Sequence, residues 1–140
     1  MSKKILIAGC GDIGSRLGTL LMEDGHQVWA IRRNTDKLPD GFQPIAADLT
    51  KPMDASLLPN DLSTVYCTIA ASERSDAGYK SAYVDGVENL IAALQNQTKL
   101  ERLIFVSSTS VYGQRGGAWV DEESPTDPPN FNGQRMLEAE

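Results

Sequence analysis

Three glycines near the start of the chain are spaced for phosphate binding. Residues 9–14 read Gly-Cys-Gly-Asp-Ile-Gly, after a short apolar run and before a segment with helical spacing. In a strand–turn–helix of this kind the first glycine permits the bend and the second lets a pyrophosphate approach. The third lets the helix pack against the strand, and the free N–H groups at the start of that helix face the phosphate. We predict a dinucleotide site at Gly9, Gly11, Asp12, Ile13 and Gly14, the alternative being a glycine-rich turn that binds no ligand.

Two arginines bear on which dinucleotide this site takes. Arg32 and Arg33 follow the second apolar run, residues 27–31. An acidic residue at that position would bind the ribose 2′-hydroxyl of NAD. A guanidinium instead forks onto a phosphate and cannot accept a hydroxyl proton. The pair therefore predicts NADP(H) in preference to NAD, the alternative being a solvated basic turn.

Asp48 and Leu49 follow a weaker apolar run at residues 43–47. The carboxylate of Asp48 either accepts a hydrogen bond from the adenine amino group or caps the turn that follows. Both interpretations stay open from the sequence.

Composition narrows the classes of function. The 140 residues suffice for one domain with a core, and a net charge of −6 argues against nucleic acid as a partner. No apolar stretch is long enough to form a membrane helix. The single histidine, His26, excludes a histidine metal cluster, and because His26 follows Gly25 in a predicted surface turn we expect no Ser-His-Asp triad. Cys10 and Cys67 have neither metal-ligand spacing nor a disulfide framework, so we expect no metal, reduced thiols and a cytoplasmic protein.

Strand and helix patterns alternate along the chain. The strands expected are residues 5–8, 27–31, 43–47, 64–68 and 102–107. A short helical turn follows Asn34, a helix is expected to begin at residues 50–54, and a long one runs over residues 75–97. The long helix carries an apolar stripe made of Tyr83, Val87, Leu90, Ile91 and Leu94. After a polar loop at residues 108–132, a last helix begins at Gly133.

This alternation predicts an α/β fold with a doubly wound parallel sheet, the Rossmann architecture. Right-handed crossovers give the strand order 3-2-1-4-5, with ligands beyond the carboxyl ends of the strands. The apolar run 102–107 predicts a strand buried on both faces. Residues 1–140 form one NAD(P)-binding domain in this interpretation. Since they end inside an amphipathic helix, we expect the N-terminal half of a longer protein whose substrate part is absent.

Five segments, met in order, carry a family resemblance. They are the glycine turn, Asp48 with Leu49, Thr-Ile-Ala-Ala at 68–71, Tyr-Val-Asp-Gly-Val-Glu-Asn-Leu at 83–90, and Val-Ser-Ser-Thr-Ser-Val-Tyr-Gly at 106–113. Over nearly the whole chain they resemble the NAD-dependent epimerase/dehydratase family of extended short-chain dehydrogenases/reductases. The resemblance adds Leu49, Ala70 and Ala71 to the cofactor site. It also implies a small-molecule substrate and, because members often pair through helices of this sheet, a homodimer as one assembly.

The resemblance also implies catalytic residues, and there the chain departs from the pattern. Ser108 matches the residue that orients the substrate. A Tyr-x-x-x-Lys pair performs the proton chemistry in the family, but Asn132 and Met136 hold those positions here. The chain thus resembles an atypical branch that lacks the pair. Tyr83, which replaces a supporting asparagine, is a weaker choice for the acid and also suits core packing. Tyr112 is a weaker candidate for a residue that contacts the substrate. The alternative is that it packs under the loop.

Two functions follow from these residues. One is an oxidoreductase or epimerase that acts on a nucleotide sugar or a small carbonyl or hydroxyl compound. The other is a catalytically silent NADP(H)-binding sensor or regulator. The missing Tyr-Lys pair favours the sensor, whereas the retention of Ser108 and of the loop on the nicotinamide side favours the enzyme.

Overall fold

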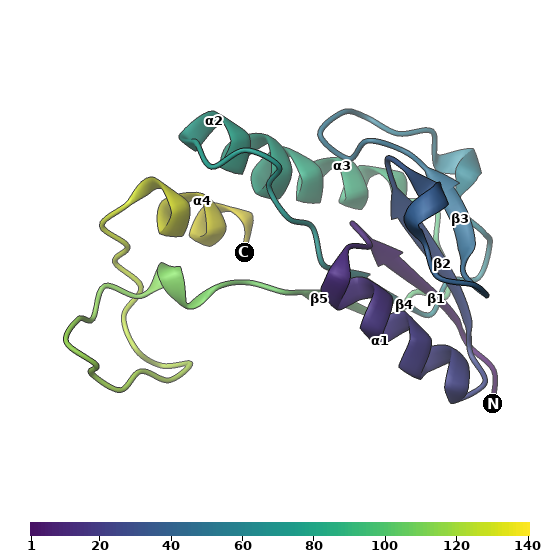
Figure 1. Ribbon diagram of the computed structural model, residues 1–140, viewed down its shortest axis with the longest axis horizontal. Helices are drawn as coiled ribbons and strands as arrows, with labels where there is room; N and C mark the ends of the chain where they lie inside the picture. The colour runs from purple at the N-terminus through teal and green to yellow at the C-terminus, as the bar shows by residue number, and fades with distance from the viewer.

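A parallel five-stranded sheet forms the centre of the computed structural model, which describes residues 1–140 (Figure 1). Its strands are β1 Lys4–Ala8, β2 Gln27–Arg32, β3 Gln43–Ala46, β4 Thr64–Cys67 and β5 Arg102–Phe105. They lie in the order β3-β2-β1-β4-β5. This confirms the predicted doubly wound topology, and it places the carboxyl ends of all five strands along one edge.

Helices cover both faces of the sheet. α1 Asp12–Glu23 lies on one face, and the continuous helical segment of α2 Asp76–Tyr79, η3 Lys80–Asp85 and α3 Gly86–Ala93 lies on the other (Figure 1). α4 Phe131–Ala139 packs against α2 and η3. Short 3-10 turns occur at Thr35–Lys37, Ala55–Leu57 and Thr109–Val111. None of the helices is both long enough and apolar enough to cross a membrane.

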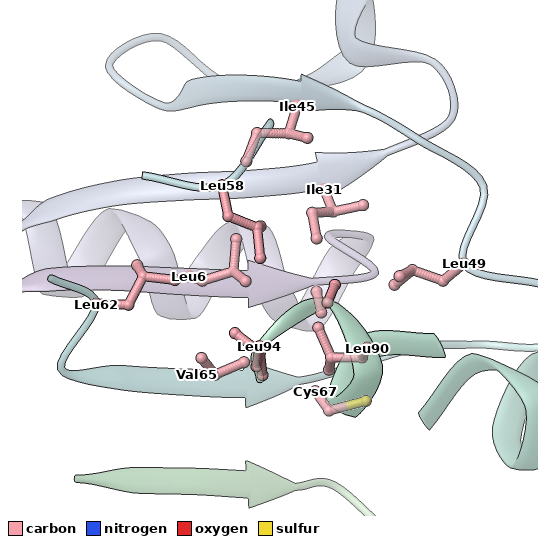
Figure 2. Packing of buried hydrophobic residues seen from close by; sticks show 12 residues of the cluster. Leu6, Ile31, Ile45, Leu49, Leu58, Leu62, Val65, Cys67, Leu90 and Leu94 are labelled. Atoms are coloured by element: carbon pink, nitrogen blue, oxygen red, sulfur yellow. The ribbon is translucent and has the colours of Figure 1, made fainter. Parts of the chain in front are cut away.

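The alternation of side chains along β1 divides the core in two. Leu6 and Ala8 join a cluster of 12 buried residues under α3, whereas Ile7 joins a cluster of 5 under α1. Figure 2 shows the larger cluster, with Leu90 and Leu94 over β1 and β4. Because β1 is buried on both faces, it reads as a continuous apolar run in the sequence.

The turn that ends α1 also follows its sequence. Gly25 has a φ of +88°, and the amide of His26 donates to the carbonyl of Leu21 at 3.1 Å. A glycine in the left-handed region is the usual stop for a helix. His26 in turn accepts a hydrogen bond from the amide of Lys3 at its Nδ1, so its role is local.

The helix expected to begin at residues 50–54 is absent, and that prediction was wrong. Only the 3-10 turn Ala55–Leu57 forms between β3 and β4. Side-chain caps compete with helix formation there: Asp48 accepts from the amide of Thr50, and Asp54 accepts from the amide of Ser56. Pro52, between them, has no N–H to donate. The segment still delivers the buried Leu58 and Leu62 to the core.

The long helix agrees in extent, but its centre is a π-helix. Residues 80–85 have the wider π geometry, and this shifts which side chains face the sheet. Ala82 and Val84 in this segment are buried, while Ile91 of α3, which the predicted stripe included, is 44% exposed.

β5 is not buried on both faces as the sequence predicted. It is an edge strand, and Leu103 and Ile104 are 40% and 38% exposed. The apolar side chains of β5 could pack against a further element beyond the edge of the sheet. Within residues 1–140 no further strand or helix lies there to cover them.

Candidate cofactor site

One cavity of about 950 Å³ runs along the carboxyl edge of the sheet. At its arginine end it is lined by residues that follow β2 and β3, among them Arg33, Asp48 and Leu49. At its serine end it is lined by residues that follow β5, with α4 opposite: Ser107, Ser108, Asn132 and Met136. Because β1 and β4 lie between these ends in the sheet, the glycine turn sits at the middle of the cavity.

The first glycine meets two conformational demands. Gly9 has a φ of +77°, and a Cβ there would lie 2.7 Å from the Cα of Ile69. The amides of Gly9 and Cys10 both donate to the carbonyl of Ile31, at 3.1 and 3.0 Å. The turn is therefore held against the end of β2, with no room for a side chain at its first residue.

The other two glycines have the different environments that the motif predicts. A Cβ at Gly14 would lie 2.8 Å from Oγ1 of Thr68 and 2.9 Å from Cγ2 of Ile7. This confirms the role of Gly14 in close packing of helix and strand. A Cβ at Gly11 would meet no protein atom within 4 Å, although Gly11 lines the cavity. The backbone is thus open to close approach at the position where a pyrophosphate would lie.

The start of α1 suits an anion. Gly11 is its N-cap, and no side chain caps the first turn. Asp12 and Ile13, the first two residues of the helix, line the cavity. Uncapped N–H groups and the positive end of the helix dipole favour a bound phosphate. The residues present therefore fit the phosphates of a dinucleotide.

The arginine end holds both predicted arginines, but in different states. Arg32 is half-buried, and its Nη1 donates to the carbonyl of Cys10 at 3.0 Å. Arg33 is exposed and makes no hydrogen bond or ion pair with the protein.

Asp48 caps its turn. Its Oδ1 accepts from the amide of Thr50 at 3.0 Å and from the Thr50 hydroxyl at 2.7 Å. These bonds lower the pKa of the Asp48 carboxyl, with smaller contributions from the charges of Arg33 and Lys51. Because both bonds end on Oδ1, Oδ2 is left for a second partner. The two interpretations offered by the sequence are thus compatible.

Asn89 supports the same end and was not predicted. Its Nδ2 donates to the carbonyl of Leu49 at 2.8 Å, which ties α3 to the turn after β3. Leu49 lines the cavity and is 7% exposed. In the sequence, Asn89 is a polar residue directly before Leu90 of the apolar stripe. The simpler interpretation of such a residue is exposure on the helix surface.

Two tyrosines of the long helical segment, Tyr79 and Tyr83, line the cavity. The amide of Ala71 donates to the hydroxyl of Tyr83 at 3.4 Å, and the Tyr79 ring lies edge-on to Tyr83 with centroids 5.3 Å apart. Tyr79 also contacts Phe131 edge-on at 5.5 Å. Tyr79, which the sequence analysis missed, precedes Tyr83 by one helical turn, and that spacing was its signal. Ala70 and Ala71 line the cavity as expected.

The serine end contains the residues that the resemblance singled out, except Tyr112. Ser108 is exposed, and its Oγ accepts from the amide of Ser110 at 3.1 Å, so the hydroxyl proton stays free to be donated. Tyr112 does not line this cavity: its hydroxyl donates to the carbonyl of Asp121 at 2.9 Å and holds the loop.

α4 is anchored so that Asn132 and Met136 face the serine end. Arg135 forms a two-bond ion pair with Asp76 of α2, with Nε and Nη2 at 2.7 and 3.1 Å from the two carboxylate oxygens. A Cβ at Gly133 would clash with the carbonyl oxygen of Ser110, so α4 lies close against that turn. Asn132 and Met136 line the cavity, and Met136 is 3% exposed. No titratable side chain stands at either position.

Burial of the two thiols gives a prediction about alkaline pH. Burial raises the pKa of Cys67 from 9.0 to about 11, and it also raises the pKa of Cys10. A folded thiol that holds its proton more tightly than the unfolded one stabilises the fold below pH ~9, and this contribution declines as pH rises toward ~11. Urea unfolding of the wild type should lose free energy over that window. Cys67→Ala should lose less, and equal slopes would contradict the assignment.

Comparison with known proteins agrees with this geometry. The chain is 30% identical to the protein YeeZ of Escherichia coli over 150 aligned positions, which cover 99% of this chain and 52% of that protein. A structure from Methylobacillus flagellatus, assigned as an NAD-dependent epimerase/dehydratase, is 38% identical with a TM-score of 0.78, covering 98% of this chain and 48% of that one. The UDP-glucuronic acid 4-epimerase of Bacillus cereus, solved with NAD, is 27% identical with a TM-score of 0.77, covering 97% and 49%.

The chain therefore spans about half the length of these relatives. A family model described as NAD(P)H-binding matches residues 9–128, from the first glycine of the turn to the loop before α4. The chain belongs to this NAD(P)H-binding family, and its fold is that of the NAD-dependent epimerases and dehydratases.

Proposed function

We propose that this chain binds NADP(H) in the cavity along the carboxyl edge of its sheet. The observation that carries the proposal is the continuity of that cavity, which joins Arg33, the glycine turn and Ser108 in one groove. Arg33 and Asp48 would hold the adenosine end, and Gly11 with the start of α1 would hold the pyrophosphate. The nicotinamide would then lie toward Ser108. A guanidinium with no protein partner at the adenosine end favours the 2′-phosphate of NADP(H) over the 2′-hydroxyl of NAD.

We further propose that the protein is an oxidoreductase or epimerase for a nucleotide sugar or a small carbonyl or hydroxyl compound. The similarity to a UDP-glucuronic acid 4-epimerase supports the nucleotide sugar. Bound NADP(H) would supply hydride transfer. Ser108 would donate a hydrogen bond from its free hydroxyl to the substrate oxygen and so orient the substrate. Tyr83 is the candidate for the general acid. Its hydroxyl oxygen accepts a hydrogen bond from the amide of Ala71, which leaves its proton free, and Tyr83 lines the cavity.

A second function has its own support. Asn132 and Met136 face the serine end, and neither supplies a titrating proton or a charge there. This favours a sensor or regulator that binds NADP(H) without turnover.

The cofactor is tested by titrating the protein with NADPH and NADH and following the quenching of tryptophan fluorescence. NADPH is expected to bind about 10- to 100-fold more tightly, the contribution of charge-assisted bonds to one added phosphate. Equal affinities, or tighter binding of NADH, would contradict the choice of NADP(H).

Turnover separates the two functions. The protein is assayed for hydride transfer with UDP-sugars and small carbonyl compounds. If turnover occurs, Ser108→Ala is expected to lower kcat by about 100-fold, as the loss of one aligned donor does. Ser108→Thr, which keeps the hydroxyl, should retain most of it. Thr109→Ala is the matched control in the same turn. Tight NADPH binding without turnover on any substrate favours the sensor.

A further inference from the structure

Arg32 and Arg33 are neighbours in sequence but have different environments. The Arg32 guanidinium is half-buried, and its Nη1 lies 3.0 Å from the carbonyl oxygen of Cys10. Both arginines line the cavity, but Arg33 is exposed and has no protein partner. Asp48 lines the same end of the cavity, and the charge of Arg33 lowers the pKa of its carboxyl. The two cations are therefore not equivalent ligands for one phosphate.

The carbonyl that Arg32 holds belongs to the glycine turn. The amide of Cys10 donates to Ile31 at 3.0 Å, so the end of β2 contacts Cys10 through both its N–H and its C=O. On the other side of the same peptide unit, the amide of Gly11 donates to the carbonyl of Gly9 at 3.0 Å. Since a peptide unit is planar, these bonds fix the orientation of the Cys10–Gly11 peptide from both sides.

This peptide stands directly before α1. The carbonyl of Gly11 accepts the first helical bond, from the amide of Ser15 at 2.9 Å. Its orientation therefore sets the direction in which the first free N–H groups of α1 point. Arg32 also compensates a carbonyl dipole that would otherwise stand uncompensated beside the anion site.

We infer that the two arginines have different roles in binding the cofactor. Arg32 is a positioning residue that holds the glycine turn for any ligand with a pyrophosphate, and Arg33 alone recognises the 2′-phosphate. This rests on the proposed function of the cavity. Nη1 of Arg32 is committed to the carbonyl of Cys10, a residue 1% exposed that has no other side-chain donor at this oxygen, whereas every donor of Arg33 is free for a ligand.

Two small probes separate these roles. ADP carries the pyrophosphate but no 2′-phosphate, whereas 2′-AMP carries the 2′-phosphate but no pyrophosphate. Arg33→Ala is expected to weaken 2′-AMP binding by about 10- to 100-fold and to leave ADP within about twofold. Arg32→Ala is expected to do the reverse, weakening ADP by about 10-fold or more and leaving 2′-AMP within about twofold. Affinities are measured by calorimetry or by protein NMR titration.

The controls address charge and folding. Lys51→Ala removes a positive charge that also acts on Asp48 but does not line the cavity, and it should change neither affinity by more than about twofold. Arg32→Lys keeps a cationic donor group and should recover part of the ADP affinity, with 2′-AMP unchanged. It takes the place of Arg32→Ala if that variant does not fold. A merely structural effect of Arg32 would weaken both probes alike.

The outcomes distinguish this inference from the proposed function. If Arg32→Ala weakens 2′-AMP as much as Arg33→Ala does, or if Arg33→Ala weakens ADP, the division of roles is wrong while NADP(H) binding stands. If the wild type binds ADP but shows no preference for NADPH over NADH, the choice of cofactor fails and the role of Arg33 fails with it. The ADP series then still decides the role of Arg32. A wild type that binds neither probe overturns both.

Discussion

Replacing Gly11 by aspartate is expected to abolish binding of NADPH while the fold keeps its stability. The new side chain would meet no protein atom within 4 Å at its Cβ, and the φ of −98° lies outside the left-handed region that favours glycine. Aspartate is also a favoured N-cap, and a negative charge at this end of α1 interacts well with the helix dipole. That same charge would stand where the pyrophosphate approaches. NADPH affinity should fall by at least about 100-fold, the loss of two charge-assisted bonds.

The matched variant for this test is Gly14→Ala in the same motif. Its Cβ would lie 2.8 Å from Oγ1 of Thr68 and 2.9 Å from Cγ2 of Ile7, so the protein must shift to admit one methyl group. Overpacking of this kind costs about 1–3 kcal/mol. Thermal melts followed by circular dichroism should thus show a lower Tm for Gly14→Ala and an unchanged or higher Tm for Gly11→Asp. Retained NADPH binding by Gly11→Asp would refute the placement of the pyrophosphate.

Leu6→Ala is expected to destabilise the protein by about 2–5 kcal/mol, the range for a large-to-small change in a packed core. Leu6 is 0% exposed, lies on the central strand β1 and belongs to the cluster of 12 residues beneath α3 (Figure 2). Neighbours on β2 and β4 hold it on either side, so the space left by its side chain cannot collapse easily. For a domain with marginal stability this loss is a large fraction of the total.

Urea unfolding followed by circular dichroism measures this loss, and Leu20→Ala is the control. Leu20 is 61% exposed on α1, so its truncation should change the free energy of unfolding by no more than about 0.5 kcal/mol. Similar losses for the two variants would mean that β1 is not at the centre of the core.

The fold was largely predictable because its signals are local and repeated. The apolar runs, the glycine turn and the stop at Gly25 each follow from a short stretch of sequence, and the handedness of crossovers then orders the strands. The observed order β3-β2-β1-β4-β5 agrees with that reasoning. The missing helix after β3 was an error because the side-chain caps of Asp48 and Asp54 competed with the pattern of Thr50 and Pro52.

Many residues that line the candidate site could be predicted from the sequence, but the contacts that each of them makes could not. Gly11, Asp48, Ser108 and Tyr83 all line one cavity, as expected from their places at the ends of strands or on the helix beside them. Tyr79 and Asn89 were missed because each has a simple surface or core interpretation from sequence. Tyr112 was named from its motif, yet its hydroxyl is taken by the loop carbonyl of Asp121.

The sequence by itself determined the glycine turn and the strand order, because residue type and spacing settle these. Only the tertiary structure decided the burial of β5, which depends on what lies beyond the edge of the sheet, and the π-helical centre of the long helix. It also decided that Arg32 contacts Cys10 and leaves Arg33 free. Two identical neighbouring side chains read alike in sequence, and they acquire different chemistry only when the end of β2 meets the glycine turn.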